Sequence, residues 1–288
     1  MSDHEDHFDS EDEAEIVNPS RGIKANPKIK ILVGNFERAF IVSIKSLFVL
    51  SPIFAKHVLL GLPKRDRAIL CPEMHDEVFE CFCEFERLGY YITFPGPLVK
   101  NPKDRPFDAK GDAIAAVKQR IFAKRVQHVY SIKGWTLLVA RPEVFRDETL
   151  QKFAKGILDR YHNELSQSPY PTALDEHVLF LHGDVYAIAA KYKIEKLRVL
   201  ARKMLLRVIY EAHLTYDFVG SFSQTVEYLL WATPVGDEIR GELIRFCMLT
   251  GFIFSPHPQF LHLLDNNEEV RKAVLGGPLY YHFSASCS

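Results

Sequence analysis

Hydrophobic residues follow two different periods in the first part of the chain, up to about residue 90. Apolar side chains at every second position indicate strands, and apolar side chains at every third or fourth position indicate helices. Ser51 and Pro52 mark the start of a helix, with Ser51 as N-cap and Pro52 at the first helical position. In order, the pattern predicts strands at 28–34 and 39–43, short helices at 46–50 and 52–60, a strand at 68–71 and a helix at 75–88.

A longer helical pattern occupies the chain after residue 175. One apolar stripe runs over residues 178–192 and a second over residues 197–208, with a break at Lys193 and Ile194 between them. Two stripes joined by so short a break predict an antiparallel helix pair. Further helices are predicted at 225–231 and at 238–249, the second capped by Asp237, and one or two short helices are predicted at 258–275.

The middle of the chain, residues 95–168, lies between the first region of strands and helices and the later helical region. It opens with a Pro-rich break formed by Pro95, Pro97, Pro102 and Pro106. An amphipathic pattern then predicts a helix at 150–165, and weaker patterns predict a helix at 113–130 and a strand at 135–140. Because the composition is not of low complexity, we interpret the segment as an ordered insertion rather than a linker.

Composition places the chain among globular proteins, with 47% hydrophobic and 25% charged residues. No stretch approaches the roughly 18–20 consecutive apolar residues that a membrane crossing needs. The N-terminus is acidic and lacks the apolar segment of a secretion signal. We therefore expect an intracellular protein, in the nucleus or the cytoplasm, without a membrane partner.

Charge is distributed unevenly along the chain. The first fifteen residues contain eight acidic and no basic side chains, while the rest contains 36 basic and 29 acidic ones. A segment with so little apolar surface cannot offset the entropy of ordering, so residues 1–20 are predicted to be a disordered acidic tail. Residues 100–160 contain 14 basic and 7 acidic side chains. Residues 191–207 are also basic, which we interpret as the polar side of a helix.

The basic insertion supports an alternative function. Lys118, Arg120, Lys124 and Arg125 lie near Tyr130 and Trp135 in the sequence. Basic patches with aromatic residues attract phosphates, so residues 100–135 would serve a nucleic-acid-associated regulatory protein. The chain has no helix-turn-helix or zinc-finger signature, and its net charge is −1.

Motifs of catalysis and metal binding are missing from the sequence. There is no GxSxG, GxxxxGK[ST], GxGxxG or HExxH motif. The five cysteines form no CxxC pair, and Cys81 and Cys83 lie two apart on a predicted helix, where they point in different directions. His57, His177 and His182 lie in or beside apolar helices, which is typical of structural histidines. We therefore predict no enzyme, no cofactor, no small-molecule substrate, and no catalytic, cofactor-binding or metal-binding residues.

Three blocks of motifs follow one another along the chain. The first comprises Val33-Gly34, Phe40-Ile-Val42, Leu47, Leu50-Ser51-Pro52-Ile-Phe54, Ile69-Leu70 and Glu77-Val-Phe79. The second is residues 181–197, with a Val-Tyr-x-x-Ala-x-Lys-Tyr-x-Ile-x-x-Leu pattern, and the third is residues 225–240. Together the blocks resemble the BTB/POZ domain, specifically its large fungal variety.

The resemblance implies an α+β fold, with a small sheet flanked by helices, and a non-enzymatic function. It implies one BTB/POZ-like domain over residues 26–212, interrupted by the insertion at about 97–172 and followed by a C-terminal helical extension over residues 213–288. Proteins of this family are protein–protein interaction modules. We therefore expect an adaptor or scaffold that binds protein partners, a second copy of itself among them.

The chain departs from the family pattern at two sites. Ser43 stands where the family usually has His, and Ile44 and Lys28 stand where dimerising members often have a basic residue and a facing Asp. Any dimer must therefore use other contacts. Members that recruit a cullin scaffold tend to carry a hydrophobic-x-Glu signature before the third strand, whereas this chain has Leu62-Pro-Lys-Arg-Asp-Arg67. The sequence gives no support for a ubiquitin-ligase adaptor.

Overall fold

The structure is a computed structural model that describes residues 27–35, 37–60, 64–65, 68–93, 177–212 and 214–276. Within the insertion it describes five residues, all helical: Glu148, Lys152, Lys155, Gly156 and Asp159. The last four lie within the helix predicted at 150–165. The predicted acidic tail, the helix predicted at 113–130 and the strand predicted at 135–140 lie outside the described residues.

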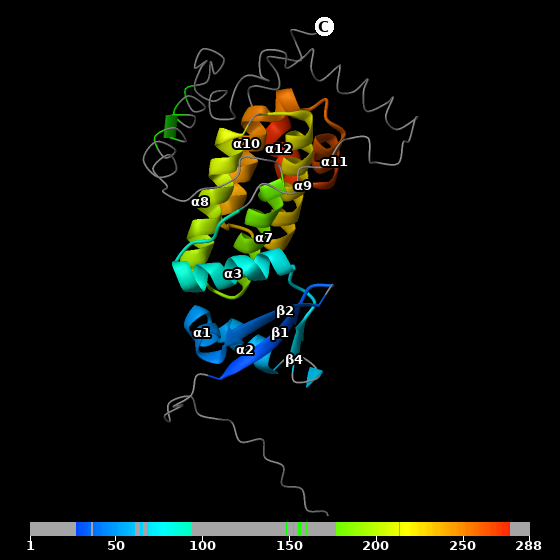
Figure 1. The fold of residues 1–288 in the computed structure, drawn as a ribbon. Helices are drawn as coiled ribbons and strands as arrows, with labels where there is room; N and C mark the ends of the chain where they lie inside the picture. Colours follow the sequence, from blue (N-terminus) through cyan, green and yellow to red (C-terminus); the bar gives the residue numbers. More distant parts are fainter. Residues whose placement is uncertain are drawn as a thin grey trace, which may run out of the picture.

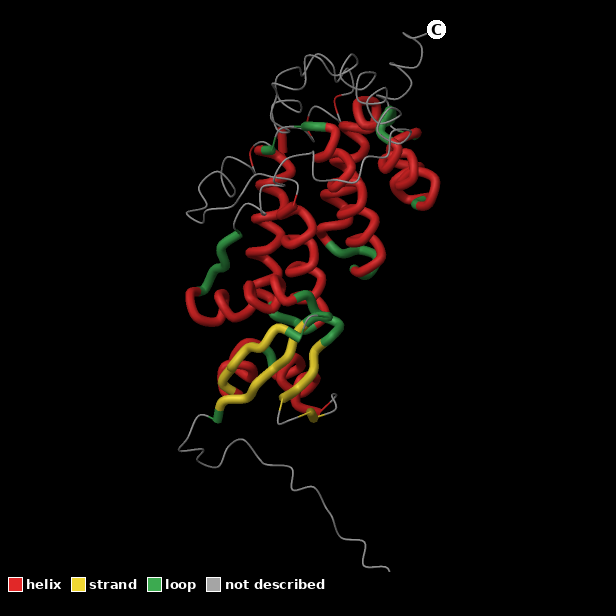
Figure 2. Tube along the Cα trace, turned by 45° about the vertical axis from the view of Figure 1, so that its right-hand side comes forward, coloured by secondary structure: helices red, strands yellow, loops and turns green. Residues whose placement is uncertain are grey.

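The sheet is mixed and contains the predicted hairpin (Figure 2). Its strands are β1 (Lys28–Val33), β2 (Arg38–Ser43), β3 (Lys64–Arg65) and β4 (Ala68–Cys71), in the spatial order β2-β1-β4-β3. β1 pairs antiparallel with β2 and parallel with β4. The turn after β1 passes through Gly34, whose φ of 72° lies in the left-handed region that glycine adopts readily. β3 was not predicted, because two residues are too short to show a period.

Three helices pack on one face of this sheet. They are α1 (Ile44–Leu50), α2 (Pro52–Leu60) and α3 (Asp76–Leu88). Ile31 and Phe40 face each other across the β1–β2 ladder, and the Phe40 ring contacts Phe79 of α3 with ring centroids 4.8 Å apart. Phe79 is in turn 6.2 Å from Phe54 of α2, measured between ring centroids. The aromatic side chains thus join the sheet to its helical layer.

Side-chain caps fix where the first helices begin. Ser51 Oγ accepts a hydrogen bond from the Phe54 main-chain N–H at 3.1 Å, so the predicted N-cap is confirmed. Ser43 caps α1 in the same way, accepting from the Ser46 N–H at 3.2 Å. The helix predicted at 75–88 is confirmed: α3 ends at Leu88, which is 41% exposed, before left-handed Gly89.

The second half of the described chain is a helical bundle that stands against α3 (Figure 1). Its helices are α7 (His177–Lys191), α8 (Glu195–Glu211), α9 (Tyr216–Ala232), α10 (Glu238–Phe254), α11 (Pro258–Asn266) and α12 (Glu268–Leu275). α7 and α8 form the predicted pair, and the predicted region 258–275 contains two short helices. None of the helices in the described part of the chain is long and apolar enough to cross a membrane.

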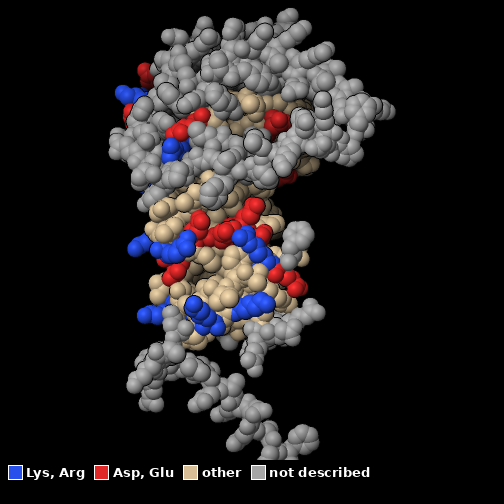
Figure 3. All heavy atoms as spheres, in the orientation of Figure 1, with Lys and Arg blue, Asp and Glu red and all other residues tan. Residues whose placement is uncertain are grey.

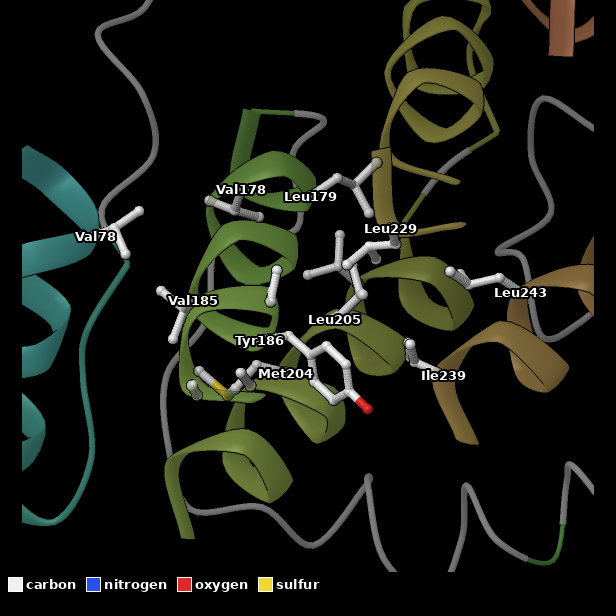
Figure 4. Packing of buried hydrophobic residues seen from close by; sticks show 14 of the residues in the cluster. Val78, Val178, Leu179, Val185, Tyr186, Met204, Leu205, Leu229, Ile239 and Leu243 are labelled. Atoms are coloured by element: carbon white, nitrogen blue, oxygen red, sulfur yellow. The ribbon is translucent and has the colours of Figure 1, made fainter. Parts of the chain in front are cut away.

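One hydrophobic core runs through both parts. Figure 4 shows Val78 of α3 pointing toward Val185 of α7, and Leu205, Leu229 and Leu243 from three further helices turned toward one another. These residues belong to a single cluster that extends from Ile31 to Val274. The fold is therefore α+β, with the sheet and the bundle sharing their buried side chains.

Two predicted helices are longer than their sequence pattern indicated. α9 begins at Tyr216 rather than 225, because Thr215 caps it by accepting from the Phe218 N–H at 3.1 Å. α10 continues to Phe254 rather than ending at 249. Gly and Ser residues with weak helix propensity lie in these added turns, so propensity alone ends the helices too early. The predicted cap of α10 by Asp237 is confirmed, at 3.0 Å from the Ile239 N–H.

Candidate interaction site

The thiols of the described residues are held in the neutral form. Cys71, Cys81 and Cys247 are buried, and burial raises the pKa of each, that of Cys71 to about 12. In the part of the chain that the structure describes, no three His, Cys, Asp or Glu side chains come together as a metal site would require.

At the end of β4, hydrogen bonds join a cysteine, a carboxylate and a histidine without the geometry of a metal site. The Cys71 thiol donates to Glu73 Oε1 over 3.4 Å, and the same oxygen is 2.7 Å from His57 Nε2. A catalytic cysteine needs a thiolate activated by a neighbouring base. Here the thiol contacts the carboxylate rather than the imidazole, and both burial and Glu73 raise its pKa. The cluster is arranged as a structural contact between α2 and the turn after β4.

His182 is a second buried contact. Its Nδ1 lies 2.8 Å from the Tyr91 hydroxyl, and neither residue is exposed to solvent. Burial lowers the pKa of His182 to about 3, so the imidazole is neutral. This pair joins the segment after α3 to the middle of α7, which agrees with the structural role predicted for His182.

An open groove of about 370 Å³ lies between β2, α1 and α3. Its floor is apolar and largely aromatic. It is formed by Phe40, Leu47, Leu50, Phe54, Phe79 and Phe82. The Phe54 and Phe82 rings are in contact, with centroids 5.7 Å apart, so the floor is part of the packed core rather than a loose surface.

Carboxylates of α3 line one rim of this groove, hereafter the β2 groove. They are Glu80, Glu84 and Glu86, followed by Arg87. Overall, α3 contains five acidic side chains and one basic side chain. Figure 3 shows Asp and Glu side chains in a band across the middle of the molecule, at the height of α3 in Figure 1, with Lys and Arg side chains below it.

One end of the rim is closed by an ion pair from the sheet. Arg38 donates to both carboxylate oxygens of Glu80, at 2.8 and 3.1 Å, and its guanidinium lies 5.1 Å from the centroid of the Phe40 ring. The hydrogen bond with Glu80 raises the pKa of Arg38. Glu84 accepts from the Ile92 main-chain N–H at 2.8 Å, which fixes the segment after α3. Among the described residues no ion pair engages Glu86.

The other wall of the β2 groove is the outermost strand of the sheet. β1 is the only strand of the described sheet that pairs with β2, so the outer main-chain groups of β2 have no strand partner there. Ile41 lies on the face of β2 opposite Phe40 and is 73% exposed. Val49 of α1 and Ile53 of α2 are further exposed apolar side chains of this region.

A second hollow, of about 480 Å³, lies where the turn after β4 meets α7 and α9. Trp231 is at its edge and is 83% exposed. The Tyr228 ring stands 6.4 Å from Trp231 and 6.3 Å from Phe180, measured between centroids. Burial and a hydrogen bond with Asp184 raise the pKa of Tyr228.

The three arginines of the basic run 191–207 are paired with carboxylates. Arg198 donates to Glu195, Arg202 donates to Glu238 at 2.7 Å, and Arg207 is bonded to a neighbouring acidic residue, Glu211, at 3.0 Å. These arginines therefore form the polar side of α8, as predicted. The basic segment 100–135, on which the nucleic-acid alternative depends, lies outside the described residues.

Comparison with known proteins gives no relative for this chain: no family model, no curated protein and no solved structure matches it. The resemblance to BTB/POZ domains stays a prediction. The sequence predicted no site residues, and the groove formed around Phe54 and Phe82 was not among its predictions. In the sequence, Ile41 within a predicted strand and the acidic run at 76–86 are features of this surface, but neither by itself predicts a groove.

Proposed function

We propose that this chain is a non-enzymatic protein–protein interaction module, an adaptor or scaffold with a BTB/POZ-like core. The β2 groove carries the proposal. It combines an aromatic floor, an exposed apolar side chain at Ile41 and a sheet edge without a strand partner in the described structure. Apolar surface of this kind is stabilised when a partner buries it.

The layout of the sheet supports the BTB/POZ-like core. β1 pairs antiparallel with β2 and parallel with β4. The two short helices α1 and α2 follow β2 in the chain and lead toward β4. The α7–α8 pair lies against α3 although about ninety residues separate α3 from α7 in the sequence (Figure 1). This arrangement favours one domain over residues 26–212 with an insertion at 97–172, followed by the extension 213–288.

A second copy of the chain is a candidate partner at α1 and α2. The residues at the positions of the family's charged dimer pair are Ile44 and Lys28, so charge does not support that contact. Val49 is 72% exposed and Ile53 is 43% exposed, and both are apolar. A dimer that buried Val49 and Ile53 would be held by hydrophobic contact instead of by the family's charged pair.

The proposal is tested by comparing surface variants for retention of protein partners. The immobilised full chain, Ile41→Asp and Leu261→Asp are incubated with the same cell extract, and retained proteins are quantified by mass spectrometry. Leu261, on α11, is 46% exposed and serves as the matched control. We expect a set of proteins retained by the wild type and the control but not by Ile41→Asp. Identical retention by all three, or retention of no protein, contradicts the proposal.

A further inference from the structure

The acidic rim and the sheet edge of the β2 groove together indicate what kind of segment it binds. We propose that β2 pairs with an extended segment of another protein, in which Lys or Arg alternates with apolar residues. This inference rests on the proposed function and names the partner of the same site. Its support comes from three features: the edge of β2, which pairs with no described strand other than β1, the placement of charge on α3, and the symmetry that a second copy would impose.

The first feature is the edge strand. An extended peptide that lies beside β2 supplies N–H and C=O groups to the outer main-chain groups of that strand. Side chains of an added strand alternate between the two faces of the sheet. Those on the outer face meet Ile41, for which a Val or Ile is a favourable cross-strand neighbour. Those on the helical face enter the β2 groove.

The second feature is the combination of an aromatic floor with an acidic rim. A Lys or Arg side chain that enters the groove lays its aliphatic stem over Phe40 and Phe82 and carries its charged end to the rim. Glu84 and Glu86 then lie at the end of such a side chain, and Glu86 has no ion-pair partner among the described residues. A shorter side chain would contact the aromatic floor without reaching the rim. An acidic side chain would be repelled by the rim carboxylates.

The pKa of the Cys83 thiol responds to the same carboxylates of α3. Cys83 lines the groove, and its pKa is raised to about 12, first by burial and then by Glu86 and Glu80, while Arg87 acts in the opposite direction. The carboxylates thus disfavour negative charge inside the groove. A cation in the same place is favoured by the same interaction.

The third feature is symmetry, which argues against a second copy at this edge. Two identical edge strands that pair antiparallel are related by a two-fold axis perpendicular to the sheet, so both α3 helices lie on the same face. The carboxylates of Glu84 and Glu86 of both copies would then lie on the same side of the joint, while Glu80 stays paired with Arg38 of its own copy. Like charges placed opposite each other weaken a complex, whereas a basic segment is attracted.

The probe is a short capped peptide in which Lys alternates with Val and Thr, labelled for fluorescence anisotropy and titrated with the full chain. A peptide with Glu in place of every Lys is the charge control. We expect saturable binding of the Lys peptide that weakens with salt, and no binding of the Glu peptide. Glu86→Lys should weaken binding on the order of fivefold, because an exposed charge contact is lost and reversed. Glu77→Lys, on the same helix but outside the groove, should leave binding unchanged.

A second experiment tests whether the peptide forms main-chain hydrogen bonds with β2. Two further Lys peptides carry N-methyl groups on alternate amides, one in each of the two registers. In a strand, one set of amides faces β2 and the other faces solvent. We therefore expect one peptide to lose binding and the other to retain it. Equal loss in both registers, or equal binding of the Lys and Glu peptides, overturns the inference.

Two other occupants are separated by the same measurements. A chain that dimerises, and whose dimer the Lys peptide dissociates, would assign the edge to a second copy. A synthetic peptide of residues 117–133 that binds more tightly than the Lys peptide would assign it to the chain's own basic segment. Both results overturn this inference. If Ile41→Asp abolishes partner retention while the Lys peptide does not bind, the proposed function stands and this inference alone fails.

Discussion

The Ser51 hydroxyl donates a hydrogen bond of 2.6 Å to the main-chain carbonyl of Tyr192, a residue 141 positions later in the chain. The same Oγ accepts from the Phe54 N–H and caps α2. The Tyr192 ring also packs on Phe54, with centroids 4.8 Å apart. Ser51 therefore begins α2 and also fixes the turn between α7 and α8 against that helix.

Ser51→Ala removes both of these bonds. We expect the free energy of unfolding to fall by about 1–3 kcal/mol, because a helix loses its cap and a buried carbonyl loses its donor. Urea denaturation followed by circular dichroism measures the change. Ser46→Ala is the control, since Ser46 uses only its main-chain N–H in the α1 cap, and it should change stability by less than about 0.5 kcal/mol.

Phe82→Ala should be among the most destabilising substitutions in the first block. Phe82 is 1% exposed and contacts the Phe54 ring, so its truncation leaves a cavity between α2 and α3. Truncation of a buried Phe costs about 3–5 kcal/mol. Chemical denaturation of Phe82→Ala beside Leu88→Ala, at the exposed end of the same helix, tests this. A loss below about 1 kcal/mol in Phe82→Ala would place the residue outside the core.

The two blocks should depend on each other for folding. Ser51 bonds to Tyr192 and Tyr91 bonds to His182, so a fragment of residues 1–95 lacks the partners of both. We expect this fragment to show no cooperative thermal transition. Replacing residues 99–170 by a short Gly/Ser linker should leave a cooperative transition, since each doubling of loop length costs only about 0.6 kcal/mol. A sharp transition of the 1–95 fragment would instead show two independent domains.

Two glycines of α10 should respond in opposite directions to replacement by alanine. A Cβ at Gly251 would lie 2.5 Å from Val274 Cγ1 of α12, whereas the nearest atom to a Cβ at Gly241 is 3.7 Å away, at the end of the Arg245 side chain. Gly251→Ala should destabilise by about 1–3 kcal/mol through overpacking. Gly241→Ala should stabilise by about 0.5–1 kcal/mol through helix propensity. Thermal unfolding of both variants checks the signs, and a stabilised Gly251→Ala contradicts the close approach of α12.

The buried His182 should make stability depend on pH. Its pKa falls from 6.5 to about 3 on folding, because burial disfavours the charged form. Between these values the unfolded chain binds a proton that the folded chain does not, so stability is present above pH 6.5 and is lost as the pH falls. The loss attributable to this group approaches 1.4 kcal/mol per pH unit.

His182→Gln should therefore flatten the fall in stability between about pH 6 and 4, measured by urea denaturation across that range. His75→Gln is the control, since the His75 side chain is 78% exposed. Parallel curves for the wild type and His182→Gln would show that His182 does not carry this dependence.

Local pattern determined much of this fold from sequence alone. The hairpin, the start of α2 at Ser51 and Pro52, and the α7–α8 pair all follow from short-range signals: alternation, capping and a helical apolar stripe. Such signals work because each acts within a few residues of the chain, where the main chain leaves few choices. The burial of Phe54 and Phe82 follows from the same pattern.

The tertiary structure alone decided the rest. α9 and α10 continue through residues of weak propensity because packing outweighs it, as the contact of Gly251 with Val274 shows. The β2 groove could not be read from its residues, since Phe40 and Phe79 look like core in sequence and the rim residues look like a solvated helix face. Only the packing of α3 beside the outermost strand brings the aromatic floor, the carboxylates and the strand edge together. The sequence sets each residue's chemistry, and long-range contacts decide which of them share a surface.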